Sequence, residues 1–357
     1  MDKILRVLIV DDSALIRKGL AGILETDPGI EVVGFAANGA EALEKIDQLK
    51  PDVITLDIDM PVMDGLTAIR HIMIKFPLPI VALSSLVNNG SVTFEALRLG
   101  VVDFVPKPSQ GVHEKTETVK ENIINRIKVA CDVNLDNIRR VRLPKVWDSE
   151  KRLDKLYAYQ PLEYVVVIGT TLSGPNTIIR ILSSLSPTLP ASVIVLQEIS
   201  NRIINSFTRQ FNMHVPWKVE VAKDGDIISQ GTCYICSNES SPIIEQNQKG
   251  QPYIRMKPSA SYPLNRFFAS AAHIFHQNTI GVLLTGVGDD GADGFYAIGK
   301  NSGITMVQDA RCCVYPNLTR NALEQGVVDM EVEDNRISEV LEEIITRGVD
   351  DHYRGDK

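Results

Sequence analysis

The sequence predicts an α/β protein built from two doubly wound parallel sheets in succession. Short apolar runs alternate with helical segments twice, first from residue 4 to about 130 and again from Tyr164 onward. The chain has 357 residues, which favours two domains at about 150 residues per domain. Its hydrophobic content of 44% and charged content of 23% are typical of a soluble globular protein.

The first half contains five predicted strand-helix units. Strand-like runs lie at residues 5–10, 31–35, 53–56, 80–83 and 103–105. The helix after Ser13 places Ile16 and Leu20 on one face, and the last helix carries Ile123 and Ile127 on one stripe. Five such units predict a flavodoxin-like parallel sheet, for which the strand order 2-1-3-4-5 is common.

The second half repeats the alternation. Strand-like runs lie at residues 164–168, 192–196, 218–221, 231–236, 279–284 and 304–307, with an expected β excursion near 231–257. Pro175 opens a helix in which Ile178, Ile181 and Leu182 follow the helical spacing. We therefore expect a first domain over residues 1–130 and a second over residues 161–350.

Residues 131–160 differ in composition from both halves. Basic side chains crowd this stretch, which contains a single proline, Pro144. A solvated linker with some helix is the favoured interpretation, and a docking segment for an anionic partner is the alternative.

Charge and hydropathy exclude several classes of function. The net charge of −8 argues against a general nucleic-acid surface. The amino terminus leads directly into a strand rather than into an apolar signal core, and no apolar run approaches the roughly 20 residues of a membrane span. We expect a cytoplasmic protein without membrane insertion.

Polar residues follow four strands of the first predicted sheet. Asp11 and Asp12 follow the first strand, Asp57 the third, Ser84 ends the fourth and Lys107 follows the fifth. The carboxyl ends of parallel strands meet at the edge where such sheets bind ligands. Three carboxylates suit Mg²⁺, and with the lysine they can hold a phosphoryl group during its transfer to Asp57.

These residues also carry a resemblance to a known family. The stretches Val10-Asp11-Asp12-Ser13, Met60-Pro61, Asp64-Gly65 and Lys107-Pro108, with Asp57 and Ser84, resemble a response-regulator receiver domain. The resemblance implies Asp57 as phosphoacceptor, a sensor histidine kinase of the CheA type as phosphodonor, and a cis bond at Lys107-Pro108. It also implies Ser84 as switch residue and Asp12, Asp57 and the Asp59 carbonyl as Mg²⁺ ligands, with Asp11 nearby.

Two turns rich in small residues form a second candidate site. Residues 168–174 make a strand-to-helix turn where a nucleophile can lie beside backbone N–H groups, and residues 285–291 make a similar turn. These turns and the Asp224-Gly225 pair between them resemble the methylesterase domain of the CheB type. The resemblance implies removal of methyl esters from glutamates of methyl-accepting chemoreceptors, and deamidation of glutamines there.

The Ser, His and Asp of that family's triad correspond here to Thr171, Glu198 and Asp290. A carboxylate with a pKa of about 4.3 is a weak base toward an alcohol, and the β-branched threonine crowds its own attack. We therefore expect an impaired output domain that acts by binding a partner. The alternative is an active esterase and deamidase that uses these three residues, and His214 and Ser173 are possible substitutes in it. The loop 257–263 also keeps little of the family pattern beyond a proline.

Three further motifs favour ordinary structural roles. Residues 286–291 read GxGxxG with Asp309 about 20 residues on, but two aspartates lie where a dinucleotide pyrophosphate must approach. His273 and His276 lack a third metal ligand. The CxxC at Cys233 and Cys236 lies in a strand-like run, where its two thiols face opposite sides.

The whole sequence thus predicts a phosphorylation-gated two-component response regulator of chemotaxis type. In the family's logic the unphosphorylated receiver covers the output face, and phosphorylation at Asp57 releases it.

Overall fold

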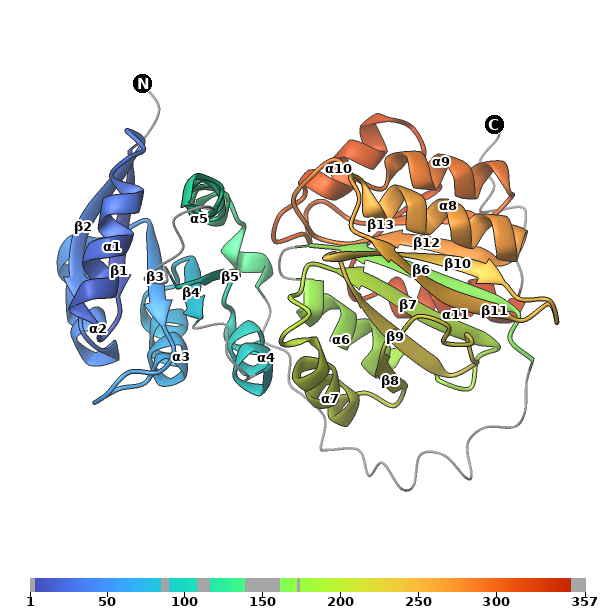
Figure 1. Ribbon diagram of the computed structural model, residues 1–357, viewed down its shortest axis with the longest axis horizontal. Coiled ribbons are helices and arrows are strands. Elements are labelled where there is room, and N and C mark those ends of the chain that lie inside the picture. Colours follow the sequence, from blue (N-terminus) through green and yellow to red (C-terminus); the bar gives the residue numbers. More distant parts are fainter. Residues whose placement is uncertain (1–3, 85–89, 108–115, 139–160, 172–173, 348–357) are drawn as a thin grey trace. The chain divides into compact units, whose positions relative to one another are not determined.

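The computed structural model describes residues 4–84, 90–107, 116–138, 161–171 and 174–347 (Figure 1). The chain forms two compact units that divide near residue 140. In the described residues no helix is both long and apolar enough to cross a membrane. The predicted linker falls largely on residues 139–160, outside the described part.

The first unit is a five-stranded parallel sheet in the order β2-β1-β3-β4-β5, as predicted. Its elements are β1 (Leu5–Val10), α1 (Ala14–Leu24), β2 (Ile30–Ala36), α2 (Gly39–Leu49), β3 (Val53–Asp57), α3 (Gly65–Lys75), β4 (Ile80–Ser84), α4 (Gly90–Leu99), β5 (Asp103–Pro106) and α5 (Thr116–Cys131). Apolar residues from β1, β3 and β4 pack with those of α2 and α3 in one fully buried cluster. The near-continuous apolar strands are what a sheet covered on both faces requires.

The second unit is a seven-stranded parallel sheet in the order β14-β13-β12-β6-β7-β9-β8. Its strands are β6 (Tyr164–Thr170), β7 (Ala191–Gln197), β8 (Lys218–Val221), β9 (Thr232–Ser237), β12 (Thr279–Leu283), β13 (Ile304–Gln308) and β14 (Met330–Val332). On one side of β6 lie β7, then β9, with β8 at the edge, and on the other side β12, β13 and β14 follow in chain order. The sheet is doubly wound as predicted, and its switch point lies between β6 and β12.

Helices cover both faces of this sheet. They are α6 (Gly174–Ser184), α7 (Ile204–His214), α8 (Pro263–Phe275), α9 (Ala292–Lys300), α10 (Asn317–Glu324) and α11 (Ile337–Arg347). Figure 1 shows α8, α9 and α10 on one face and α6, α7 and α11 on the other. The predicted β excursion is an antiparallel hairpin of β10 (Ser240–Gln246) and β11 (Pro252–Pro258).

The last helix closes onto the first helix of this unit. Ser338 Oγ of α11 donates a hydrogen bond to the Ile181 carbonyl of α6 at 3.2 Å. Glu342 Oε1 of α11 accepts from the Ser186 N–H, just beyond α6, at 2.7 Å. Ile337, Leu341 and Ile344 of α11 are buried in the same face.

Candidate functional site

Three carboxylates and one ammonium group meet at the carboxyl edge of the first sheet. Asp11 and Asp12 follow β1, Asp57 ends β3, and Lys107 follows β5. Lys107 Nζ lies 2.7 Å from Asp57 Oδ2 and 2.9 Å from Asp11 Oδ2. The Asp11 and Asp57 side chains are buried, whereas Asp12 is exposed. The fold thus brings together four of the residues that the sequence placed at this edge.

The two buried carboxylates are held by backbone groups and by the lysine. Asp57 Oδ1 accepts a hydrogen bond from the Ile58 N–H at 2.8 Å, and Asp11 Oδ1 accepts one from the Ser13 N–H at 2.8 Å. Burial raises the pKa of Asp57, and the neighbouring Asp11 charge adds to this, while Lys107 opposes it. Burial by itself lowers the pKa of Lys107, but its bonds to Asp57 and Asp11 outweigh burial and raise it. The site therefore holds a charged lysine and a carboxylate that favours a further cation.

The carboxylates fit a magnesium ion. One oxygen each from Asp11, Asp12 and Asp57 lies within 4.8 Å of the others. Octahedral Mg²⁺ binds oxygen at about 2.1 Å, so its ligand atoms lie at most about 4.2 Å apart, and a small adjustment reaches that spacing. Asp59 lies two residues beyond Asp57 with an exposed side chain.

Two other predicted residues lie partly outside the described region. Ser84 ends β4 opposite Pro106 in the sheet register, as the strand-end pattern placed it, but its side chain is outside the described part. The predicted cis bond at Lys107-Pro108 involves Pro108, which is not among the described residues.

The loop from β3 to α3 has an unusual backbone. Val62 has φ of 69°, in the left-handed region that β-branched residues avoid, and its side chain is 89% exposed. The Met63 N–H donates to the Pro61 carbonyl at 2.8 Å across Val62, which makes a three-residue turn. At Gly65 a Cβ atom would lie 2.3 Å from the Asp57 carbonyl oxygen, so only glycine fits at this position behind Asp57.

The second candidate site lies at the switch point of the second sheet. Thr171 directly follows β6, and its Oγ1 accepts a hydrogen bond from the Val287 N–H at 2.6 Å and contacts the Val287 carbonyl oxygen at 3.2 Å as donor. The approach is close, because a Cβ at Gly286 would lie 2.5 Å from Thr171 Oγ1. A Cβ at Gly174 would lie 2.2 Å from Thr170 Oγ1. Glycine at position 286 lets the two predicted turns pack against each other, and glycine at position 174 lets the first turn close on Thr170.

Asp290 caps the start of α8. Its Oδ2 accepts from the Leu264 N–H at 2.7 Å and its Oδ1 from the Asn265 N–H at 2.9 Å. Asn265 Oδ1 in turn accepts from the Gly291 N–H at 2.9 Å and the Gly294 N–H at 3.0 Å, at the start of α9. The two helix starts thus cap each other. Burial raises the pKa of Asp290, and the backbone N–H groups oppose this rise.

Glu198 directly follows β7 and is half-buried. Thr170 and Gln197 are register partners on β6 and β7, so Thr171 and Glu198 follow neighbouring strands. The structure therefore places two triad-equivalent residues at adjacent strand ends, and the third, Asp290, at the start of α8.

The backbone amides of the GxGxxG stretch are already engaged. The Val287 N–H donates to Thr171, the Gly288 N–H to Asn317 Oδ1 at 2.7 Å and the Gly291 N–H to Asn265. A pyrophosphate needs such amides free, and this engagement argues against dinucleotide binding.

The other sequence motifs have structural explanations. Cys233 and Cys236 are both buried, and burial raises the pKa of each thiol. His273 and His276 are exposed, with ring centroids 6.4 Å apart. In the described residues the Asp11, Asp12 and Asp57 group is the one set of three or more His, Cys, Asp or Glu side chains with metal-ligand spacing. His214 ends α7, and Ser173 lies outside the described part.

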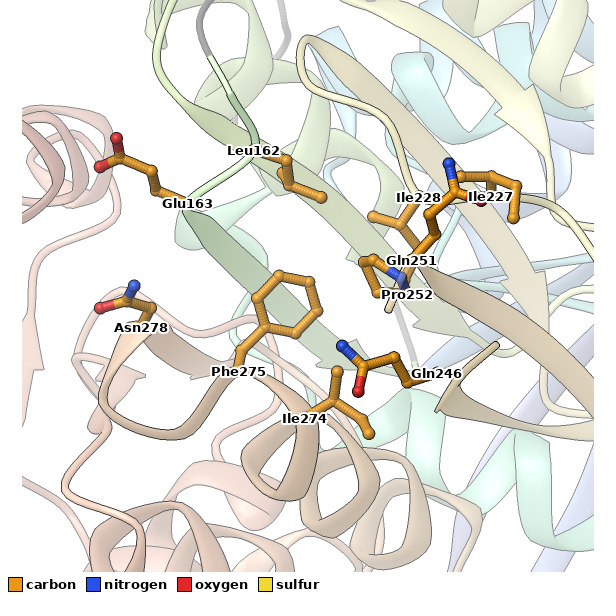
Figure 2. Close-up of a pocket in the computed structure, with 10 residues that line it drawn as sticks. All are labelled: Leu162, Glu163, Ile227, Ile228, Gln246, Gln251, Pro252, Ile274, Phe275 and Asn278. Atoms are coloured by element: carbon orange, nitrogen blue, oxygen red, sulfur yellow. The ribbon is translucent and has the colours of Figure 1, made fainter. Parts of the chain in front are cut away.

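A hollow of about 310 Å³ lies elsewhere in the second unit (Figure 2). It is lined by residues that precede β6, flank the β10–β11 hairpin and end α8, namely Leu162, Glu163, Ile227, Ile228, Gln246, Gln251, Pro252, Ile274, Phe275 and Asn278. None of the triad-equivalent residues lines it, so it is not their substrate cleft.

Sequence reasoning missed two residues that support these sites. Asn265 lies near a helix start, where Asn is a common capping residue, and this signal was available. Arg17 donates from one guanidinium nitrogen to the carbonyl oxygens of Asp11 and Asp12, at 2.6 and 3.1 Å. An arginine on an amphipathic helix gives no sequence signal for such a contact.

Comparisons with known proteins agree with both halves of the fold. Residues 166–341 match the CheB methylesterase family, and residues 7–116 match the response regulator receiver domain. A protein-glutamate methylesterase/protein-glutamine glutaminase of Pyrococcus abyssi is 34% identical over 349 residues, covering 94% of this chain and 92% of that protein. A relative of the same name from Caldanaerobacter subterraneus is 35% identical over 357 residues, covering 96% of each chain. The Thermotoga maritima CheB methylesterase catalytic domain aligns over 52% of this chain and 100% of that domain, with 25% identity and a TM-score of 0.49.

Both the strand-end acids of the first sheet and the paired turns of the second lie within stretches that these relatives share along nearly their full length. The chain therefore belongs to the CheB-type chemotaxis family of protein-glutamate methylesterases/protein-glutamine glutaminases, with a receiver domain followed by a methylesterase domain.

Proposed function

We propose that the chain is a phosphorylation-gated response regulator in which phosphoryl transfer to Asp57 controls the methylesterase domain. The carrying observation is the placement of Lys107 Nζ between Asp57 and Asp11, 2.7 and 2.9 Å away, beside the exposed Asp12. A buried carboxylate whose neighbours supply cation ligands and a fixed ammonium group suits transfer of a phosphoryl group.

The transfer moves a phosphoryl group from a phosphohistidine of a sensor kinase of the CheA type. An Asp57 carboxylate oxygen forms a bond to phosphorus, and the bond from phosphorus to the imidazole nitrogen breaks, with its electron pair remaining on nitrogen. Lys107 stabilises the negative charge on the phosphoryl oxygens, and Ser84 contacts the same group after transfer. The backbone amide of Ile58 orients Asp57 for attack.

Asp12, Asp57 and the Asp59 carbonyl are the proposed ligands of Mg²⁺, with Asp11 nearby. A Mg²⁺ ion held by these residues would supply positive charge to offset the charge on the phosphoryl oxygens. The spacing of the Asp11, Asp12 and Asp57 oxygens supports this proposal.

The gate follows the family's organisation. We place the receiver at residues 1–130, the linker at 131–160 and the methylesterase domain at 161–350. The unphosphorylated receiver restrains the output domain, and phosphorylation releases it to act on methyl-accepting chemoreceptors. A cytoplasmic location remains a prediction from sequence.

The relatives' names favour ester and amide hydrolysis as the output. In this chain Thr171 Oγ1 would attack the glutamyl carbonyl and Glu198 would take its proton, so that methanol or ammonia leaves and water releases the glutamate. The Val287 N–H donates to Thr171 Oγ1 at 2.6 Å, so it would stabilise the oxyanion only after Thr171 Oγ1 has bonded to the carbonyl carbon and released this N–H. Asp290 holds the turn that carries this amide.

One observation favours a second candidate, in which the output domain binds a partner with little or no turnover. Thr171 Oγ1 accepts from the Val287 N–H and has the Val287 carbonyl as acceptor, so its proton points away from a base. Glu198 is also a weak base for an alcohol. Losing the serine or histidine of a comparable triad costs on the order of 10⁴- to 10⁶-fold in rate.

The receiver assignment is tested by labelling the full chain with a small phosphodonor and Mg²⁺. Wild type is expected to gain one acid-stable, alkali-labile acyl phosphate, and Asp57→Ala to gain none. Asp47→Ala, which changes a carboxylate on α2, is the matched control and should label normally. Equal labelling of wild type and Asp57→Ala would refute the assignment.

The two candidate outputs are separated by methanol release from a methyl-labelled chemoreceptor. The hydrolase is supported if the phosphorylated wild type releases methanol and if both Thr171→Ala and Asp290→Ala abolish this release. The discriminating variant is Thr171→Ser combined with Glu198→His, which supplies a hydroxyl and an imidazole base at the matched positions. No release by wild type, with release by this double variant, supports the binding function.

A further inference from the structure

We propose that Arg17 is a positioning residue for the divalent cation site of the receiver, acting through the backbone on either side of Asp12. The inference rests on the proposed metal-dependent phosphoryl transfer and names a residue that the site description does not require. Among Asp11, Asp12 and Asp57, Asp12 is the one whose side chain is exposed.

Asp11 and Asp57 are buried, and each has an oxygen held by a backbone N–H and another beside Lys107. Asp12 differs, because its side chain is exposed and accepts no hydrogen bond from the described residues. An exposed carboxylate with free rotation loses conformational entropy when it becomes a ligand. Its usefulness as a ligand therefore depends on how firmly the backbone aims it.

Arg17 fixes that backbone. One guanidinium nitrogen donates to the carbonyl oxygens of Asp11 and Asp12, at 2.6 and 3.1 Å. These carbonyls belong to the two peptide units that flank the Asp12 α-carbon, so holding both sets the direction in which its Cβ projects. Two other hydrogen bonds of the loop do not involve the Asp11 and Asp12 carbonyl oxygens. The Asp11 N–H donates to the Ala36 carbonyl, and Ser13 Oγ accepts from the Ile16 N–H.

Arg17 lies on α1, which begins at Ala14 with Ser13 as its cap. The helix thus provides a rigid base, and the half-buried arginine reaches back from it over the loop. A group that orients a metal ligand without touching the metal typically changes metal affinity 10- to 100-fold when it is removed.

Charge alone predicts the opposite effect. Arg17 is a cation near a cation site, so replacing it by a neutral residue removes a repulsion and would tighten divalent binding by roughly two- to fourfold. Positioning predicts weaker binding. The sign of the change therefore distinguishes the two roles.

The experiment measures binding of Mn²⁺, a hard divalent cation that suits the same carboxylate ligands, to the full chain by electron paramagnetic resonance of the free ion. Asp12→Ala defines the signal that belongs to the receiver site. Arg17→Met is expected to bind Mn²⁺ roughly tenfold more weakly than wild type. Lys18→Met removes the same charge from an exposed neighbour on α1 and is expected to bind as tightly as wild type or slightly more tightly.

Arg17→Met that binds Mn²⁺ as tightly as wild type, or more tightly, overturns the inference while the proposed phosphoryl transfer stands. If wild type and Asp12→Ala bind Mn²⁺ equally, the receiver site binds no metal, and this result refutes the metal-dependent transfer itself. If Arg17→Met does not fold, Arg17→Lys replaces it, because it keeps the charge while its ammonium nitrogen lies one bond closer to the backbone than the guanidinium nitrogen that contacts both carbonyls. It is expected to weaken Mn²⁺ binding roughly threefold or more, and unchanged affinity would equally overturn the inference.

Discussion

Asp290→Ala tests whether the mutual capping of α8 and α9 stabilises the methylesterase domain. The change removes the acceptors of the Leu264 and Asn265 N–H groups, which now bond to Asp290 at 2.7 and 2.9 Å. Asn265 also carries two bonds to the start of α9, so loosening it weakens the second cap as well. The variant therefore perturbs both helix starts at once.

The expected cost follows from these bonds. Loss of one N-cap acceptor costs about 0.5–2 kcal/mol, and hydrogen bonds to a charged acceptor are stronger than neutral ones. Against this, burial raises the pKa of Asp290, so removing the carboxylate also removes a desolvation cost. We expect a net loss of about 2 kcal/mol for Asp290→Ala, and about 1 kcal/mol for Asp290→Asn, which keeps one acceptor oxygen.

The assay is equilibrium urea unfolding followed by the fluorescence of Trp217, which is fully buried in the methylesterase domain. The chain has two tryptophans, so a Trp147→Phe background leaves Trp217 as the reporter. Asp289→Ala, at an exposed neighbouring position, is the matched control and should change stability by less than about 0.5 kcal/mol. Unchanged stability of Asp290→Ala in this assay would refute the capping argument.

Three further outcomes follow from the described geometry. Burial raises the pKa of Asp57 above its ordinary 3.8, so protonation of Asp57 stabilises the folded receiver. This stabilisation is lost as the pH rises through the folded-state pKa. Hydrogen exchange of the β3 amides should show this pH dependence in wild type and not in Asp57→Asn. Val62→Gly relieves the φ of 69° and should exceed Val62→Ala in stability by about 1 kcal/mol by calorimetry, with equal values contradicting the strain. Cys233 and Cys236 should resist a thiol reagent in the native chain and react after denaturation, because burial raises the pKa of both thiols; rapid native reaction would contradict this.

The receiver was the more predictable half of the molecule. Its strands are short, buried on both faces and separated by clear turn residues, so their ends are well defined in the sequence. Parallel strands deliver their ends to one edge, and this alone brings Asp57 and Lys107 to the same place. The predicted order of strands and the predicted sheet in the second half are both confirmed by the fold.

Side-chain networks were less predictable, because they depend on turns that meet from distant parts of the chain. Thr171 and Val287 are 116 residues apart, and their contact exists only once β6 and β12 pair. Asn265 and Gly291 meet for the same reason. The short edge strand β14 was also missed, since three residues carry too little alternation to recognise.

The contact of α11 with α6 has a consequence for how the chain is made. The first helix of the methylesterase domain has its partner at Ile337–Arg347, the last helix described. A ribosome must therefore synthesise the chain through residue 347 before α6 can bury that face. Until then this domain exposes apolar surface, and such non-local packing slows folding. The receiver pairs each strand within a short stretch and is complete while the rest is still being translated.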